Sequence, residues 1–283
     1  MRMMKKLLLL LLSLMLLCPA LAEETRPVMQ VHQMMIGFAD GYLIRCGDVA
    51  VLIDGGNALP EQPTDDVLRY LRAAGVERLD AYIITHWHLD HCMNLNNVLA
   101  EFGDDDTVVY APSQKVHADY DPLANGSYEQ MVPGDVISFG DMNIHCVGPY
   151  ELALEGNRNQ DSLNFVLEYG TRRILFTGDF AASANINKAY KDICTNVDVL
   201  KFPHHGMEPY EIGPAACRTT SPDYVLVPGV ANKFKIWNFF DNNGVDFPRE
   251  NVFTNADGHV VILTDGDYLE FRTQVQLEEL PTL

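Results

Sequence analysis

Short runs of apolar and β-branched residues, bounded by glycine, proline or polar turn residues, recur along most of the chain. Residues 49–53, for example, read Val-Ala-Val-Leu-Ile and precede Asp-Gly-Gly, a pattern typical of a buried strand that ends in a turn. The other runs have similar lengths and similar boundaries. We therefore predict strands over 42–46, 49–53, 81–85, 107–110, 136–139, 142–147, 163–169, 172–177, 197–202, 223–227, 259–264 and 268–273.

Helical periodicity is clearest over residues 65–74. Thr64 can cap the first turn, Val67 and Leu71 lie one turn apart on the same face, and Gly75 ends the helix. Two further helices are predicted over 93–102 and 183–193.

The order of these elements predicts the architecture. Because no linker, repeat or low-complexity stretch divides residues 23–283, we expect one domain. Strands alternate with helices in two comparable halves, which favours an α/β fold, a four-layer αββα sandwich with helices outside two packed sheets. At 47% hydrophobic residues, the chain can bury one substantial core.

The densest group of chemically active side chains directly follows the predicted strand 81–85. His86, His88, Asp90 and His91 lie within six positions. In an extended segment the two histidines at 86 and 88 point to the same side, and the turn that follows can direct the next two side chains to a second point nearby. One loop at the end of a strand is therefore predicted to serve two metal ions.

Other interpretations of these histidines are weaker. Structural histidines are usually scattered, and we expect His32, His117 and His259 to be of that kind because they have ordinary strand or loop contexts. A structural zinc site would need cysteine pairs at C-x-x-C spacing, which the sequence lacks. Imidazoles combined with carboxylates instead suit Zn, Mn or Fe in an open hydrolytic site.

Further motifs follow in a definite order along the chain. An Asp-Gly-Gly turn begins at Asp54, a strand ends in Thr-Gly-Asp at Asp179, and residues 201–206 read Lys-Phe-Pro-His-His-Gly. Together with the H-x-H-x-D-H loop, this order resembles the metallo-β-lactamase superfamily over residues 28–273. The resemblance implies a four-layer fold with metal ions at one edge between the sheets.

Within that superfamily, the chain is most similar to the hydrolase domain of bacterial competence (DNA-uptake) proteins and its stand-alone relatives. The Lys-x-x-His-His-Gly element and the Asn-rich stretch 157–163, which ends in Ser-Leu, carry this similarity. Cys92 stands where glycine is common, Met207 stands where a small residue is usual, and residues 148–163 lack a histidine that many members have. This gap predicts a weaker first metal site. The ligand expected in place of the missing histidine is an oxygen from Asn159 or Asp161, a water, or less readily His145 on a predicted strand.

The resemblance implies a ligand set for one or two divalent ions, with Zn favoured over Mn or Fe. The assigned ligands are His86 and His88 for the first ion, Asp90 and His91 for the second, and Asp179 as the bridge. The last ligand is His205 or His204. We favour His205, beside the glycine, which leaves His204 to donate to a developing oxyanion or leaving group. Asp90 is also a candidate to orient the nucleophile, a metal-bound hydroxide.

Residues 1–22 have the organisation of a secretory signal. Basic residues precede a leucine-rich run, and Ala20-Leu21-Ala22 precedes the expected cleavage. The run is too short for a stable membrane span, and Leu17 before Cys18 disfavours a lipoprotein. We therefore predict a secreted or extracytoplasmic protein. Five cysteines remain after cleavage, an odd number that cannot all pair, so we expect a thiol outside any disulfide at Cys92.

The chain is strongly acidic. Cleavage would remove three basic residues and no acidic residue from a chain of net charge −19, leaving −22. Since nucleic-acid affinity comes largely from Lys and Arg that neutralise phosphates, long nucleic acid is disfavoured as a partner.

Three functions remain open at this point. We favour a secreted metal-dependent phosphoesterase or phosphodiesterase with a small or cell-envelope substrate, because paired metals suit in-line displacement at phosphorus. The second is an amide or lactone hydrolase, β-lactams included, since the same nucleophile attacks carbonyls. The third is a weakly or non-catalytic metal-binding envelope module. The sequence does not indicate the oligomeric state.

Overall fold

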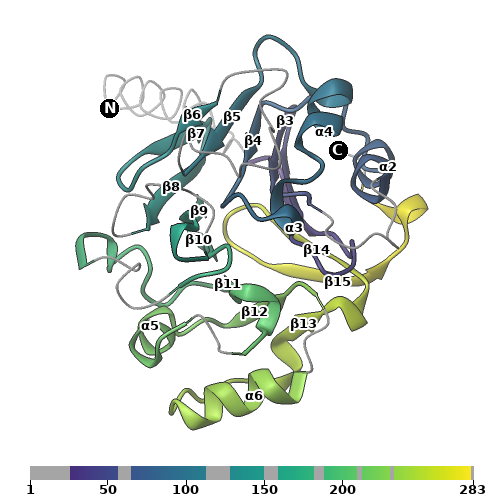
Figure 1. Cartoon of the computed structure of the whole chain (residues 1–283). Coiled ribbons are helices and arrows are strands. Elements are labelled where there is room, and N and C mark those ends of the chain that lie inside the picture. The colour runs from purple at the N-terminus through teal and green to yellow at the C-terminus, as the bar shows by residue number, and fades with distance from the viewer. Residues whose placement is uncertain are drawn as a thin grey trace, which may run out of the picture.

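Two β-sheets pack against each other at the centre of the molecule (Figure 1). The computed structural model describes residues 26–56, 65–112, 128–149, 159–181, 188–208, 212–229 and 233–281, and the predicted signal 1–22 lies outside them. The larger sheet has the order β15 (Glu270–Val275), β14 (His259–Thr264), β1 (Met29–Gln33), β2 (Tyr42–Cys46), β3 (Val49–Ile53), β4 (Ala81–Ile83), β5 (Val108–Ala111) and β6 (Glu129–Gln130). The smaller sheet has the order β13 (Val252–Thr254), β12 (Tyr224–Val227), β11 (Val199–Lys201), β10 (Arg172–Phe176), β9 (Asn164–Tyr169), β8 (Met142–Gly148) and β7 (Val136–Phe139).

The alternation of side chains along each strand builds three apolar layers. In β3, Val51 and Ile53 pack between the sheets with Phe165 and Phe176, whereas Leu52 belongs to the core on the opposite face of its sheet. A third core fills the outer face of the smaller sheet. The helices that cover these faces are α2 (Asp65–Ala73), α4 (Leu95–Phe102), α5 (Pro214–Thr220) and α6 (Lys233–Asn242).

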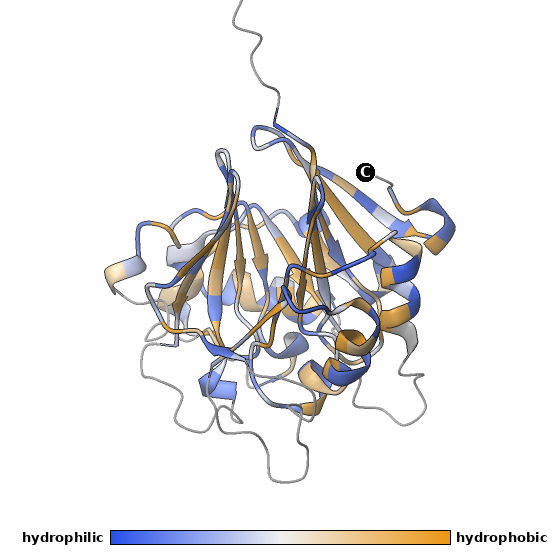
Figure 2. Ribbon diagram, turned by 90° about the horizontal axis from the view of Figure 1, so that it is seen from above, coloured by the Kyte–Doolittle hydropathy of each residue, from blue (hydrophilic) through white to orange (hydrophobic). Residues whose placement is uncertain are grey.

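The predicted four-layer αββα sandwich is confirmed. Seen from above, the two sheets run side by side and the helices lie outside them (Figure 2). Each predicted strand has an observed counterpart whose bounds differ by at most two residues. Among the described residues, none of the helices has the length and apolar character needed to cross a membrane.

Several elements differ from the prediction. The helix expected over 93–102 is observed as α4, and the metal-ligand loop before it contains an additional short helix, α3 (Leu89–Cys92), that was not predicted. The described part of the stretch 183–193 is a short 3-10 helix (Lys188–Tyr190) followed by turns, so that helix prediction is wrong there. The strands that the sequence did not reveal are β1, β6 and β13, and the helices are α5 and α6.

Strand β1 was missed because its sequence, Met-Gln-Val-His-Gln, looks polar although all five residues are buried. Its polar atoms are satisfied inside the protein. His32 Nδ1 lies 2.9 Å from the hydroxyl of Tyr70, and His32 Nε2 lies 3.0 Å from Oε1 of Gln30. His32 is therefore structural in the described fold, as expected.

The burial of His32 predicts that the folded protein becomes less stable at acidic pH. Burial lowers the pKa of His32 from 6.5 to about 3, so between these values the unfolded chain binds a proton that the folded chain does not. We therefore expect the free energy of unfolding to fall as the pH drops through this window, by about 1.4 kcal/mol per pH unit from this group. Denaturation at several pH values should give a flatter dependence for His32→Gln. Equal slopes for both proteins would contradict the assignment.

Parallel strands bring the chemically active loops to one edge. β3, β4 and β5 are parallel in one sheet, and β10, β11 and β12 are parallel in the other. Because the carboxyl ends of parallel strands share an edge, the loops after β3, β4, β10 and β11 converge. α3, which follows β4, lies at this edge between the two sheets (Figure 1).

Candidate metal centre

Four side chains from three loops converge at this edge. Asp90 and His91 lie on α3, Asp179 follows β10, and His205 lies in the 3-10 turn His204–Gly206 after β11. One ligand atom from each lies within 4.8 Å of the others, close enough to surround a single metal ion. His205 Nε2 is 3.1 Å from Asp90 Oδ2, and His91 Nε2 is 3.3 Å from Asp179 Oδ1.

A second group of candidate ligands lies beside the first and shares one residue with it. It consists of His86, His88 and Asp179. His86 Nε2 lies 3.0 Å from His88 Nδ1 and 3.7 Å from Asp179 Oδ2. Since the other oxygen of Asp179 faces His91, this carboxylate presents one oxygen to each group.

Buried carboxylates orient two of the histidines. Asp54 Oδ2 lies 2.8 Å from His91 Nδ1, and Asp54 itself accepts hydrogen bonds from the backbone and hydroxyl of Thr85. Asp40 Oδ1 lies 3.2 Å from His205 Nδ1. The hydrogen bond to Asp54 fixes the ring of His91, and the carboxylate of Asp40 lies beside Nδ1 of His205 as an electrostatic contact. Each ring then directs Nε2 toward the shared centre, an arrangement typical of metal-binding histidines.

The backbone around these groups is tight. Asp54 and His205 have φ values of 52° and 53°, a left-handed conformation that costs free energy in residues other than glycine and is typical of functional sites. Gly56 lies against α3, where a Cβ would come within 2.3 Å of His91 N. The Asp-Gly-Gly turn therefore fixes both the carboxylate that orients His91 and the position of the helix that carries it.

Lys201, the last residue of β11, places a positive charge at the base of the site. Its side chain is only 1% exposed, and its ammonium group contacts Asp40 Oδ2, donates a hydrogen bond to Gly178 O at 2.5 Å and lies 3.8 Å from Asp179 Oδ1. A buried ammonium needs such partners, because desolvating an unpaired charge is very costly. Lys201 and Asp40 thus form an ion pair that connects β11 to the ligand His205.

Metal ions fit this set of donors. Among the described residues, His91 Nε2 and Asp179 Oδ1 are buried and have no hydrogen-bond partner, as expected for atoms that face a cation. Burial opposes charge on His205, but Asp40 and Asp179 raise its pKa to about 9. For His91, nearby carboxylates likewise outweigh burial and raise the pKa well above its ordinary value. The centre therefore has a negative potential that attracts positive charge.

Comparison with known proteins agrees with this geometry. The family model described as the metallo-beta-lactamase superfamily matches residues 36–206, more than half of the chain. The chain belongs to the metallo-β-lactamase superfamily. Members of this superfamily are metal-dependent hydrolases, so the chain is assigned to that class of enzyme.

Two known proteins are similar to this chain. It is 26% identical over 147 residues to ComE operon protein 3 of Bacillus subtilis, which supports the predicted resemblance to competence proteins. That match covers 50% of this chain but only 19% of the relative. The metallo-beta-lactamase fold protein YhfI from Bacillus subtilis has a similar structure, with a TM-score of 0.53, 14% identity, and coverage of 87% of this chain and all of that one. At this identity the likeness concerns the fold alone.

The first metal site of this centre lacks the histidine that many superfamily members have. His145 belongs to none of the described ligand groups, because β8 places its Nε2 3.8 Å from Glu168 Oε1. Asp161 is buried and is also outside these groups. Asn159 Oδ1 is buried without a hydrogen-bond partner among the described residues, so the hypothesis of an amide oxygen ligand is kept for Asn159.

Ser162 was not singled out from the sequence, although it ends the Asn-rich stretch. Its hydroxyl lies 3.4 Å from His86 Nδ1 and accepts a hydrogen bond from the backbone of Asp179 at 3.0 Å. Ser162 therefore connects one candidate ligand of the first metal site to the shared carboxylate. A Cβ on Gly178 would approach this serine to 2.8 Å, which explains the glycine in the Thr-Gly-Asp motif.

Two further residues from the sequence prediction take defined places. His204 is half-buried and lies outside the ligand groups, with its ring centroid 6.3 Å from that of His205. Cys92 packs in the core beneath α2 and α4, and burial raises the pKa of its thiol to about 12. None of the five cysteines in the described part of the chain forms a disulfide. Cys92 is therefore placed as a packed residue, outside the metal ligand groups.

Proposed function

We propose that the chain is a secreted phosphoesterase or phosphodiesterase that acts on a small or cell-envelope substrate. The observation that supports this most is the pair of adjacent ligand groups joined by the two oxygens of Asp179. Two divalent ions, Zn in preference to Mn or Fe, would supply a water with its pKa lowered to about 7 and polarise the phosphoryl oxygen. The assigned ligands are His86, His88, Asp90, His91, Asp179 and His205.

The charge of the centre favours an anionic substrate. Its described residues include four buried or nearly buried carboxylates and the ammonium of Lys201, a net charge of −3 when the histidines are neutral. The carboxylates are Asp40, Asp54, Asp90 and Asp179. Two divalent cations would make the centre net positive, which attracts a phosphoester, whereas one would leave it net negative.

The protein's own residues would position the reaction. Asp90 is the least buried of the four carboxylates, so it can orient the attacking water in addition to binding metal. His204, next to the ligand His205, is the proposed proton donor to the leaving group. Asp54 and Asp40 hold the rings of His91 and His205.

Two alternatives follow from the same site. A metal-activated water also attacks carbonyls, so an amide or lactone hydrolase, β-lactams included, is the second candidate. The absent loop histidine favours the third, a weakly or non-catalytic binding module. A panel of phosphodiester, lactone and cephalosporin reporter substrates, run with metal analysis, separates them. Two metals per chain with phosphodiester turnover supports the proposal, whereas one metal and no turnover supports the module.

The proposal predicts different results for short and long phosphodiesters. A nitrophenyl phosphodiester or a dinucleotide meets only the metal centre and should be cleaved. Duplex DNA meets the whole surface, where the net charge of −22 expected after removal of three basic residues from a chain of −19 opposes binding, so it should remain essentially uncut even at low ionic strength. Both substrates should be incubated with the metallated protein. Degradation of duplex DNA that is lost in His86→Ala would show that the charge argument is wrong.

Secretion is part of the proposal and rests on the sequence of residues 1–22. The purified mature protein should begin at Glu23, be found outside the cytoplasmic membrane and carry no lipid. Intact-mass measurement tests this prediction. A mass that includes a diacylglyceryl group on Cys18 would contradict the cleavage site after Ala22.

A further inference from the structure

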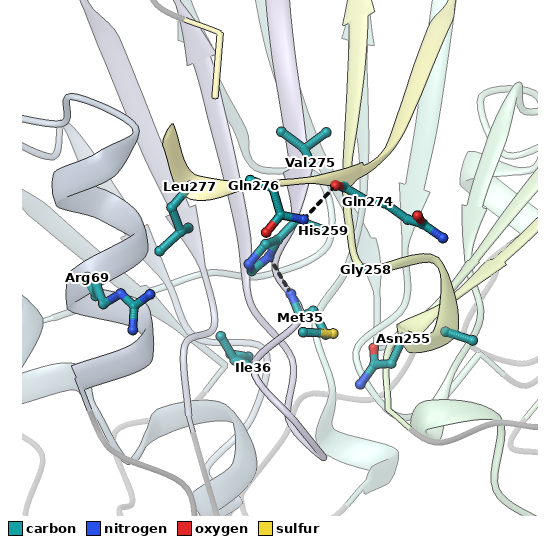
Figure 3. A pocket seen from close by; sticks show the side chains of 11 residues that line it. Met35, Ile36, Arg69, Asn255, Gly258, His259, Gln274, Val275, Gln276 and Leu277 are labelled. Carbon is teal, nitrogen blue, oxygen red and sulfur yellow. Dashed lines mark hydrogen bonds between the residues drawn. The ribbon is translucent and has the colours of Figure 1, made fainter. Parts of the chain in front are cut away.

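A cavity of about 450 Å³ opens at the start of strand β14, around His259 (Figure 3). Its walls come from the loop after β1, from α2 and from the β13–β14 and β15 segments, with Arg69 and Asn255 on opposite sides of His259 (Figure 3). The volume is within the range typical of small-molecule sites. Neither the predicted function nor the metal ligands use these residues.

The lining has an unusual charge for this protein. The chain has 39 acidic and 20 basic residues, yet none of the 11 described residues that line the cavity is acidic, and Arg69 supplies a positive charge. Within the described part of the chain, Arg69 forms no hydrogen bond or ion pair, whereas Arg72 on the same helix pairs with Glu101. An arginine without such a partner is well suited to a carboxylate or phosphate.

His259 adds a hydrogen-bond donor with a fixed orientation. Its Nδ1 accepts a hydrogen bond from the backbone of Met35 at 2.9 Å, so the proton of the neutral ring is on Nε2. Burial, followed by the charge of Arg69, lowers the pKa of His259 to about 4, which keeps the ring neutral near pH 7. Ile36, Val275 and Leu277 add apolar surface to the wall.

The backbone at the rim is strained. Gln274 has a φ of 54°, and the pairing of β14 with β15 is irregular between His259 and Val261. A Cβ on Gly258 would lie 2.9 Å from Gln274 Cα, so the two segments approach too closely for a side chain there. Such strain and bulges are typical of functional sites.

The cavity and the metal centre share the loop between β1 and β2. Asn255 donates a hydrogen bond to Gly37 O at 2.7 Å, and the ring of Phe38, the next residue, lies 4.7 Å from that of His205. Two residues further on, Asp40 contacts Lys201 and His205. A molecule in the cavity would therefore contact the loop that supports a metal ligand.

We propose that this cavity binds a small amphipathic anion, with Arg69 at its carboxylate or phosphate, His259 Nε2 as a further donor and its apolar body against Ile36 and Leu277. The binding itself is independent of the proposed hydrolysis. The anion is a separate small molecule or the remote end of the substrate, and both share this chemistry.

Calorimetric titration with phenylacetate tests the proposal, with the uncharged isostere phenylacetamide as the ligand control. We expect saturable binding of the anion only, and a loss of affinity of about tenfold or more in Arg69→Gln. Arg218→Gln, which changes an exposed arginine on α5, is the matched control and should bind as the wild type does. Asp179→Ala should also retain binding, because Asp179 does not line the cavity. If the metal ions captured the probe instead, binding would be lost in this variant.

The outcomes are distinct. Equal affinity in Arg69→Gln, equal binding of phenylacetamide, loss of binding in Asp179→Ala, or no saturable binding would each overturn the proposal. Once a substrate is known, phenylacetate should inhibit competitively if the cavity holds the remote end of the substrate. A change in kcat without competition would indicate a separate molecule.

Discussion

Asp179→Ala is expected to abolish metal-dependent hydrolysis while leaving the fold largely intact. The carboxylate presents one oxygen to His86 and the other to His91, so its loss removes a ligand from both groups at once. Several kcal/mol of transition-state stabilisation depend on the metals, so kcat/KM should fall by about a thousandfold or more. The fold should persist because Asp179 follows a strand end and is not among the apolar core residues.

Metal analysis and turnover of the same preparations check this result. His88→Ala provides a comparison, because it affects only the first ligand group and should remove one metal rather than both. His145→Ala, a histidine outside the ligand groups, is the matched control and should keep wild-type metal content. Wild-type turnover in a fully metallated Asp179→Ala protein would refute the bridging role.

The ligand histidines of this loop could be predicted from the sequence because they lie close together along the chain. His86, His88, Asp90 and His91 lie on one short loop, and a strand end followed by a turn brings them together without long-range information. Asp179 and His205 were reached through similar strand ends and through family resemblance. The structure places all six in two adjacent groups, although the metal assignment itself stays a prediction until metal is measured.

The residues that support the ligands could not be predicted from the sequence in this way. Asp40 lies between β1 and β2, and β1 was not recognised as a strand because its buried polar side chains hide the usual apolar pattern. The partnership of Asp40 with Lys201 depends on how two different sheets pack, which no local pattern reports. Helix α5 was missed for a simpler reason, since its Cys217, Thr219 and Thr220 have low helix propensity.

Lys201→Met is expected to destabilise the protein strongly. The change leaves Asp40 buried without its ammonium partner, which typically costs about 3–5 kcal/mol. The double variant Asp40→Leu with Lys201→Met replaces the ion pair by apolar side chains and should regain most of this stability, since such replacements are often nearly neutral. Chemical denaturation of the three proteins measures both effects.

Metal affinity should respond differently from stability, because the pair also orients a ligand. Without Asp40, Nδ1 of His205 loses its carboxylate contact, so the double variant should bind zinc about 10–100-fold more weakly at the group that contains His205. Chelator competition measures this change without any substrate. The matched control is the double variant Arg172→Met with Asp198→Leu, an ion pair away from the centre, which should alter stability but not zinc affinity. If zinc affinity recovered together with stability in the Asp40 and Lys201 double variant, the pair would be a structural contact alone, and the position of His205 would have to come from its strained backbone and the ring of Phe38.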